Sequence, residues 1–149
     1  NPPLLAANWQ KFKYTILAGA LPRTVKEMLG VIVSDANKSA YARAVHLHSL
    51  SVQGVQELWL QHLTDPESDD STLPDSLRAM IAFTRQAGRD PLGLTDGHYL
   101  ALEEAGLSEM EIAAEMLGLS EANEDSRLRL YCASARSTGA DAGRPAGVR

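Results

Sequence analysis

The sequence has one cysteine, few aromatic residues and no excess of positive charge. Its single cysteine, Cys132, excludes both an internal disulfide and a redox pair of cysteines within one chain. The formal net charge of −5, with no cluster of Lys or Arg before the C-terminal tail, argues against a nucleic-acid-binding surface. The longest apolar runs, such as residues 28–33, are far shorter than the ~20 residues that span a bilayer. We therefore expect no nucleic-acid partner and no membrane span.

The sequence also lacks a secretory signal pattern and any recognisable metal-ligand spacing. Its four histidines form no HxxxH or HExxH motif and are scattered over the chain, at His46, His48, His62 and His98. We expect His48 to lie at the surface, and His62 and His98, which are near helix ends or loops, to lie in solvent. The sequence therefore predicts a cytoplasmic protein with no metal and no cofactor.

The apolar residues recur at helical spacing in nearly every segment, and no stretch alternates as a strand would. At 149 residues and 44% hydrophobic content, the chain suits one domain with a sizeable core. We expect an all-α fold of six to eight helices that occupies residues 1–136. Residues 137–149 have no apolar periodicity and are expected to form a flexible tail.

The first helices are predicted from apolar spacing and from stop signals. One face of the first helix carries Leu4, Leu5, Trp9, Phe12 and Ile16. The sequence GALP, at residues 19–22, ends this helix and precedes a second one from Arg23 to about Ala36. The second helix is apolar over most of its circumference, so we expect it to lie at the centre of the fold.

Further helices are predicted over residues 55–63, 75–87 and 96–105, with loops over 64–74 and 88–96. Ser108 and Glu111 form a capping box, which predicts a last helix that runs to about Ser134.

A short turn at Asn37 and Lys38 separates the second helix from a third, which runs from Ser39 to about Gln53. Such a turn makes the two helices an antiparallel hairpin, in which residues equally far from the turn face each other. Glu27 and His46 are nearly equally far from it, with a mismatch of only ~1.5 Å along the axis. A buried glutamate requires a partner. We therefore predict a Glu27–His46 pair, either purely structural or active in acid–base chemistry.

The stretch KEMLGVIVSDANKSAYARAVHLHSL, residues 26–50, resembles the core motif of the alkylhydroperoxidase D-like family, within the carboxymuconolactone decarboxylase superfamily. Members of this family have a Glu on one helix, a turn with Asn, a Cys-x-x-Cys pair, and a His four residues later, often with a second His two further on. Glu27, Asn37, His46 and His48 match these positions. The flanking segments resemble the peroxidase-related branch, so the resemblance covers roughly residues 3 to 130.

The two cysteine positions of the motif fall on Ser39 and Ala42. The resemblance implies thiol peroxidase chemistry, in which a thiolate attacks a peroxide and a second cysteine resolves the sulfenic acid, with Glu27 and His46 as the proton relay. A serine hydroxyl does not replace the thiolate, and an alanine leaves no resolving partner. Cys132 matches no motif position. We therefore expect thiol peroxidase activity to be absent.

Two functions remain open. In the first, the protein is a non-catalytic homologue or a small-molecule binder. In the second, Glu27 and His46 act as a cysteine-independent acid–base couple of the carboxymuconolactone decarboxylase type, with Arg43 as the nearest basic candidate to hold a substrate carboxylate. The resemblance also implies a homo-oligomer (dimer, trimer or hexamer), and exposed Trp9 and Phe12 on the first helix would fit such an interface.

Overall fold

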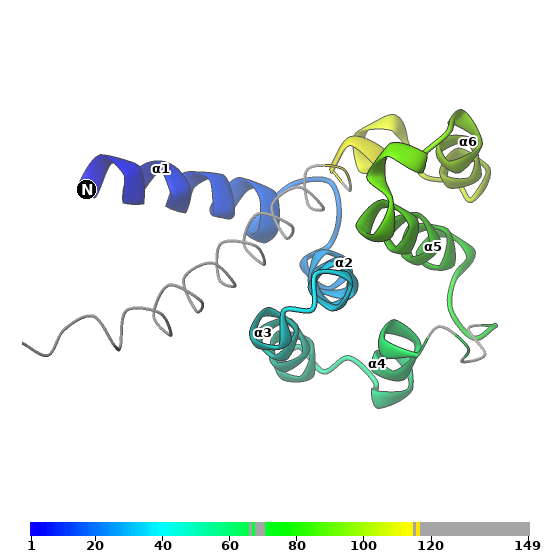
Figure 1. Ribbon diagram of the computed structural model, residues 1–149, viewed down its shortest axis with the longest axis horizontal. Coiled ribbons are helices and arrows are strands. Elements are labelled where there is room, and N and C mark those ends of the chain that lie inside the picture. Colours follow the sequence, from blue (N-terminus) through cyan, green and yellow to red (C-terminus); the bar gives the residue numbers. More distant parts are fainter. Residues whose placement is uncertain (66, 68–70, 115, 117–149) are drawn as a thin grey trace, which may run out of the picture.

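The computed structural model describes residues 1–65, 67, 71–114 and 116, which form helices joined by turns (Figure 1). Six α-helices, one π-helical segment (η1) and one 3-10 turn (η2) have both ends among these residues: α1 Pro2–Phe12, η1 Lys13–Leu17, α2 Arg23–Ala36, α3 Ala40–Val52, α4 Glu57–Thr64, α5 Asp75–Arg89, η2 Pro91–Gly93 and α6 Asp96–Glu104. A further helix begins at residue 109. Within these residues there is no strand. The predicted all-α fold is confirmed.

Local signals in the sequence set the ends of α2 and α3. Asn37 ends α2 with φ −82° and ψ 0°, and Lys38 follows with a positive φ of 56°, so the chain reverses within two residues. Ser39 is the N-cap residue of α3, and Gly54, with φ 77°, comes directly after its C-cap residue. The predicted hairpin between the second and third helices is therefore present.

The later helices also follow the predicted caps, with one exception. The Ser108 amide donates to the Glu111 carboxylate over 2.8 Å, and the Glu111 amide donates to the Ser108 hydroxyl over 3.3 Å, so the predicted capping box is confirmed. The loop predicted for residues 88–96 is wrong in part: α5 continues through Arg89, and η2 follows it. The Asp90 carboxylate accepts a hydrogen bond from the Gly93 amide over 3.1 Å, which closes this short turn.

The predictions for the end of the chain fall on residues that the structure does not describe. These are the last helix beyond residue 116, Cys132 and the tail 137–149. The domain boundaries 1–136 and 137–149 therefore stay predictions.

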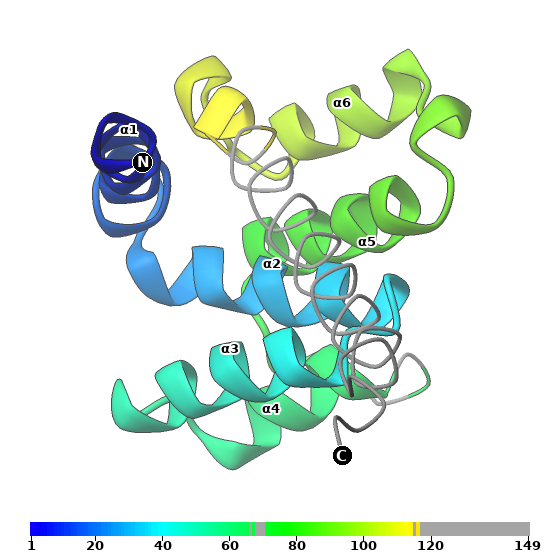
Figure 2. The same ribbon diagram turned by 60° about the vertical axis from the view of Figure 1, so that its left-hand side comes forward.

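Helix α2 lies at the centre of the fold, as predicted. Every residue from Lys26 to Ser34 is buried. Figure 2 shows α2 between α3 and α4 on one side and α5 and α6 on the other. The largest side chains with almost no exposed surface come from α2, α3, α5 and α6: Leu29, Val31, Val33, Leu50, Ile81 and Leu102. Because neighbours surround α2, its apolar residues cover most of its circumference.

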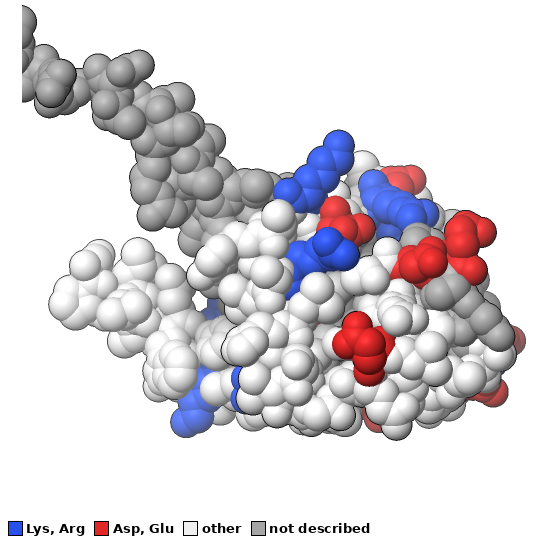
Figure 3. All heavy atoms as spheres, turned by 90° about the horizontal axis from the view of Figure 1, so that it is seen from below, with Lys and Arg blue, Asp and Glu red and all other residues white. Residues whose placement is uncertain are grey.

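Helix α1 lies outside this core. It projects from the body (Figure 1), and none of its residues is buried in the part of the chain that the structure describes. Leu5 is 73% exposed and Trp9 54% exposed, with the Trp9 ring stacked on Phe12 at a centroid distance of 5.9 Å. Figure 3 shows this arm as a surface almost without charge, and Lys11 is the one charged side chain of α1. The predicted apolar residues are present, but they do not face the core.

The contact between the arm and the body is local. Lys26 of α2 donates a hydrogen bond from Nζ to the backbone carbonyl of Ala18, directly after η1. Ile16 of η1 is buried. The arm is therefore attached to the body at its C-terminal end. No described helix is long and apolar enough to cross a membrane.

Candidate functional site

Glu27 of α2 and His46 of α3 form the predicted pair. The His46 Nδ1 atom lies 2.7 Å from the Glu27 Oε2 atom, and their side chains are 14% and 7% exposed. The antiparallel hairpin brings them together at nearly the same height, as the count from Asn37 predicts. The contact is therefore present, while its catalytic use stays a prediction.

The second oxygen of Glu27 binds two further residues that the sequence analysis missed. Ser49 donates from Oγ to Glu27 Oε1 over 2.9 Å, and Arg23 donates from Nε to the same atom over 3.3 Å. Arg23 lies one turn before Glu27, and Ser49 lies three residues after His46, so both are on the faces that already carry the pair. This spacing could have identified them from the sequence.

These contacts determine the charge state of Glu27. Burial on its own raises the pKa of the Glu27 carboxyl, but the hydrogen bonds from His46, Ser49 and Arg23 and the charge of His46 outweigh it and lower the pKa below its ordinary value. Glu27 is therefore ionised at neutral pH and can only accept hydrogen bonds. It follows that His46 carries a proton on Nδ1 and donates a hydrogen bond from this atom to Glu27. The other ring nitrogen, Nε2, is left for another partner.

Gly30 gives His46 the space that it occupies. A Cβ atom built on Gly30 would lie 2.6 Å from the His46 Cε1 atom and 2.7 Å from Nδ1. Real side chains do not approach so closely, so only glycine lets the imidazole lie against the backbone of α2. Gly30 was not among the residues predicted from the sequence. A glycine about one turn after Glu27, within the apolar stretch of a helix, was the feature of the sequence that could have indicated it.

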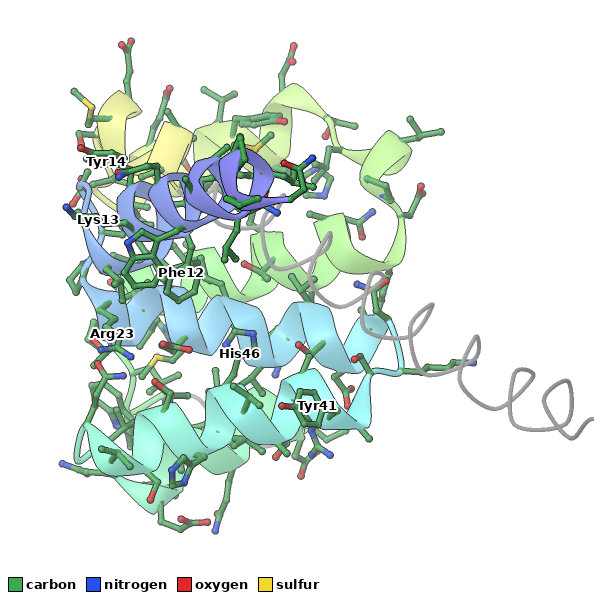
Figure 4. The ribbon with its side chains drawn as sticks, turned by 90° about the vertical axis from the view of Figure 1, so that its left-hand side faces the viewer. Phe12, Lys13, Tyr14, Arg23, Tyr41 and His46 are labelled. Atoms are coloured by element: carbon green, nitrogen blue, oxygen red, sulfur yellow. The ribbon has the colours of Figure 1, made fainter. Side chains whose placement is uncertain are left out.

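An open cavity of about 430 Å³ lies beside the pair, between α1, η1, α2 and α3. Its apolar lining consists of Phe12, Ile16, Val45 and Val52. Its polar lining consists of Arg23, Glu27, His46, His48, Ser49 and Gln53. Figure 4 shows Phe12, Arg23 and His46, three of the lining residues, on the side of the molecule that faces the viewer. The cavity therefore has apolar walls and one polar region around the Glu27 carboxylate.

Ser39 and Ala42 lie away from this cavity. They are 2% and 1% exposed, and neither is among the described residues that line it. The Ser39 amide donates to the Ser34 carbonyl over 2.8 Å at the turn between α2 and α3. The sequence places Ser39, Ala42 and His46 on one helix face, yet only His46 reaches the cavity, because the cavity is at the opposite end of α3 from Ser39.

The remaining histidines have different surroundings. His48 is exposed, as predicted, and it also lines the cavity. The prediction that His62 lies in solvent is wrong: His62 is 4% exposed, because α4 turns this side chain toward the body. His98 is partly buried, and its Nδ1 atom accepts a hydrogen bond from the Thr95 amide over 3.0 Å at the start of α6. Among the described residues, no group of three His, Cys, Asp or Glu side chains is arranged to hold a metal ion.

The basic residue of the site is Arg23 rather than Arg43. The Nε atom of Arg43 lies 3.5 Å from the Asp35 carboxylate, and Arg43 does not contribute to the described lining of the cavity. The nomination of Arg43 as the cation beside Glu27 and His46 is therefore wrong.

Several solved structures share this fold. No family model and no curated protein matches the sequence. A peroxidase-related protein from Silicibacter sp. superposes with a TM-score of 0.78 at 20% identity, over 89% of this chain and 70% of that one. A protein from Agrobacterium tumefaciens described as a putative antioxidant defence protein AhpD gives 0.75 at 18% identity, over 99% and 94%. The debrominase Bmp8, as a cysteine-to-alanine variant in complex with 2,3,4-tribromopyrrole, gives 0.73 at 21% identity, over 85% and 67%. The chain therefore has the fold of peroxidase-related, alkylhydroperoxidase D-like proteins.

Proposed function

We propose that this protein is a small-molecule-binding homologue of the peroxidase-related proteins and has no thiol peroxidase activity. One observation carries the proposal: the cavity is built around Glu27 and His46, whereas the cysteine positions of the motif hold Ser39 and Ala42, which lie outside its described lining. The relay positions are therefore available to a ligand, and the redox positions are not.

The chemistry of the two replaced positions supports the loss of peroxidase activity. Reduction of a peroxide by a thiol requires a thiolate, which becomes a sulfenic acid and then a disulfide. Ser39 ionises far less readily than a thiol and does not pass through these states. Ala42 has no heteroatom with which to form the second bond.

The lining of the cavity supports a compact, mostly apolar ligand. Pockets for small molecules are typically apolar, with a few polar groups that fix the orientation of the ligand. Phe12, Val45 and Val52 supply the apolar part here, and Glu27 and His46 the polar part. The debrominase of similar fold is in complex with 2,3,4-tribromopyrrole, a small ring with one N–H group.

Peroxide consumption with a dithiol reductant tests the first half of the proposal. We expect the wild-type protein to give the background rate. Because Ser39 and Ala42 are buried and lie outside the described lining of the cavity, the double variant Ser39→Cys/Ala42→Cys should also stay near the background rate. Robust turnover by the wild-type protein would overturn the proposal.

Binding of 2,3,4-tribromopyrrole, measured by calorimetry, tests the second half. The variant Val45→Trp should fill the cavity and abolish binding. Leu92→Trp, at a 96% exposed position on η2, is the control and should bind as the wild type does. Equal binding by both variants would show that the ligand is held elsewhere.

A second candidate function is cysteine-independent acid–base catalysis of the carboxymuconolactone decarboxylase type. The 2.7 Å contact between His46 and Glu27 favours it, together with the Arg23 side chain, which is 49% exposed and can pair with a substrate carboxylate. Incubation with lactone carboxylates in D₂O, followed by NMR, would detect decarboxylation or proton exchange. His46→Gln should abolish either reaction, and Arg23→Gln should mainly raise KM.

We also propose that the protein is a cytoplasmic homo-oligomer that covers α1. An isolated helix shorter than about 12 residues is marginal in water, yet α1 buries none of its described residues within the monomer. Analytical ultracentrifugation should show a dimer, trimer or hexamer that Leu5→Glu weakens and Leu92→Glu, its exposed control, does not. A monomer at all concentrations would contradict this part of the proposal.

A further inference from the structure

We propose that the ligand of the cavity is a weak acid with an apolar body and one ionisable O–H or N–H group, and that it binds as the anion after giving its proton to His46. This inference rests on the proposed function and adds the chemical class of the ligand. It follows from the hydrogen-bonding capacity that the described site leaves unused.

His46 offers one ring nitrogen to a ligand in the cavity. Its Nδ1 atom is engaged by Glu27, and its imidazole lies against the backbone at Gly30, so its face toward α2 is closed. Among the described residues no hydrogen bond engages Nε2, and His46 lines the cavity. In the neutral form of His46 the nitrogen left for a ligand is a lone-pair acceptor, which selects a molecule that can donate a hydrogen bond.

The cavity has no excess negative charge that would attract a cation. The charged and titratable groups of the cavity are Arg23 and Glu27 from α2 and His46 and His48 from α3, while α1 and η1 contribute only Phe12 and Ile16. Arg23 and Glu27 form an ion pair, which balances their charges. A cation bound as the ligand would have only Glu27 to face, and Glu27 already accepts three hydrogen bonds.

The ligand proton moves to His46. The ligand O–H or N–H bond breaks, its proton bonds to Nε2, and the electron pair stays on the ligand oxygen or nitrogen. His46 becomes an imidazolium that still donates from Nδ1 to Glu27, and its new charge faces the ligand anion. The total charge of the site is unchanged, and the ionised Glu27 stabilises the imidazolium. Arg23, half exposed, adds a second positive group toward the anion.

The test uses 4-nitrophenol, whose phenolate absorbs at a longer wavelength than the phenol, and 4-nitroanisole, in which a methyl group replaces the acidic proton. We expect the wild-type protein to increase the phenolate fraction at a fixed pH. It should also bind 4-nitrophenol about tenfold more tightly than 4-nitroanisole, as a charge-assisted hydrogen bond would give. His46→Gln should reduce this preference to about onefold while it still binds 4-nitroanisole. His98→Gln, which can keep the capping box of α6, is the matched control and should behave as the wild type does.

The outcomes separate this inference from the proposed function. Equal binding of the two probes to the wild type, without an increase in phenolate, would overturn the weak-acid inference and leave the binding function intact. If neither probe bound, the proposed binding function would itself fail. A phenolate increase that persisted in His46→Gln would show that another group takes the proton, which also contradicts the inference.

Discussion

Helices α1 and α2 are both rich in apolar residues, yet they have opposite surroundings. None of the residues of α1 is buried in the described part of the chain, whereas every residue of α2 from Lys26 to Ser34 is. Apolar residues at helical spacing therefore predict a helix, but they do not say what the helix packs against. For α2 the partner is the body of the same chain, and for α1 it is a proposed second copy.

The two helices also differ in how they use charge. Helix α1 carries only Lys11, which is in its last turn, where a positive charge favours the helix dipole. Helix α2 buries Lys26 and Glu27, and each has a specific partner: the Ala18 carbonyl for Lys26, and His46 for Glu27. Among the residues that the structure describes, the buried lysine and carboxylate side chains are thus confined to the junction with the arm and to the cavity.

Of the changes that test the difference between α1 and α2, truncation of an apolar side chain should have the largest effect on the free energy of unfolding. Leu29→Ala, at a 1% exposed position of α2, should lower the free energy of unfolding by about 3 kcal/mol, since it leaves a cavity in the core. Leu5→Ala, at a 73% exposed position of α1, should change it by less than about 0.5 kcal/mol at low protein concentration. Urea denaturation of both variants measures the difference, and equal losses would mean that α1 is buried in the monomer.

A smaller effect is expected for the charge of Glu27. Glu27→Gln should cost about 1–3 kcal/mol at pH 7, because the hydrogen bonds to the carboxylate are weakened in a buried site. The pKa of Glu27 in the folded protein lies below its ordinary value of 4.5, so its stabilising effect is present above pH 4.5 and is lost as the pH falls through the lower folded value. The gap in unfolding free energy between wild type and variant should therefore narrow below pH 4.5. A gap that stayed constant would show that the carboxylate charge is not what stabilises the pair.

Glycine-to-alanine changes separate the site from an ordinary helix. At Gly97, near the start of α6, a Cβ atom would be 3.7 Å from its nearest neighbour, so Gly97→Ala should stabilise the protein by up to about 1 kcal/mol. At Gly30 the same gain is opposed by the overlap with the His46 ring. Gly30→Ala should therefore give no gain in melting temperature, and it should weaken 4-nitrophenol binding. A stabilised Gly30→Ala variant with normal binding would contradict the close packing of His46.

The smallest effect on the free energy of unfolding is expected at the turns directly before and after α2. The turn before α2 uses Gly19, with φ 109°, whereas the turn after it uses Lys38, with φ 56°. A left-handed conformation costs little for glycine but is strained for lysine. Lys38→Gly should therefore raise the free energy of unfolding by about 0.5 kcal/mol, measured by thermal denaturation. A clear loss of stability would mean that the Lys38 side chain has a structural role.

The sequence by itself determined the helices and the central pair. The ends of α2 and α3, the capping box of Ser108 and the Glu27–His46 contact all depend on residues close in sequence or equally far from one short turn. Such relations depend on helix geometry, which is the same in every protein. The resemblance of residues 26–50 to the alkylhydroperoxidase D-like motif predicted the fold, and the solved structures that superpose on this chain have that fold.

Only the tertiary structure decided which surfaces the helices present to each other. The exposure of α1, the burial of His62 and the separation of Ser39 and Ala42 from the cavity each depend on distant segments, about which local spacing carries no information. The close approach of His46 to Gly30 and the choice of Arg23 over Arg43 depend on how α2 and α3 are rotated about their axes. Burial is a property of the whole packed chain, so the sequence could name the pair at this site but not the cavity beside it.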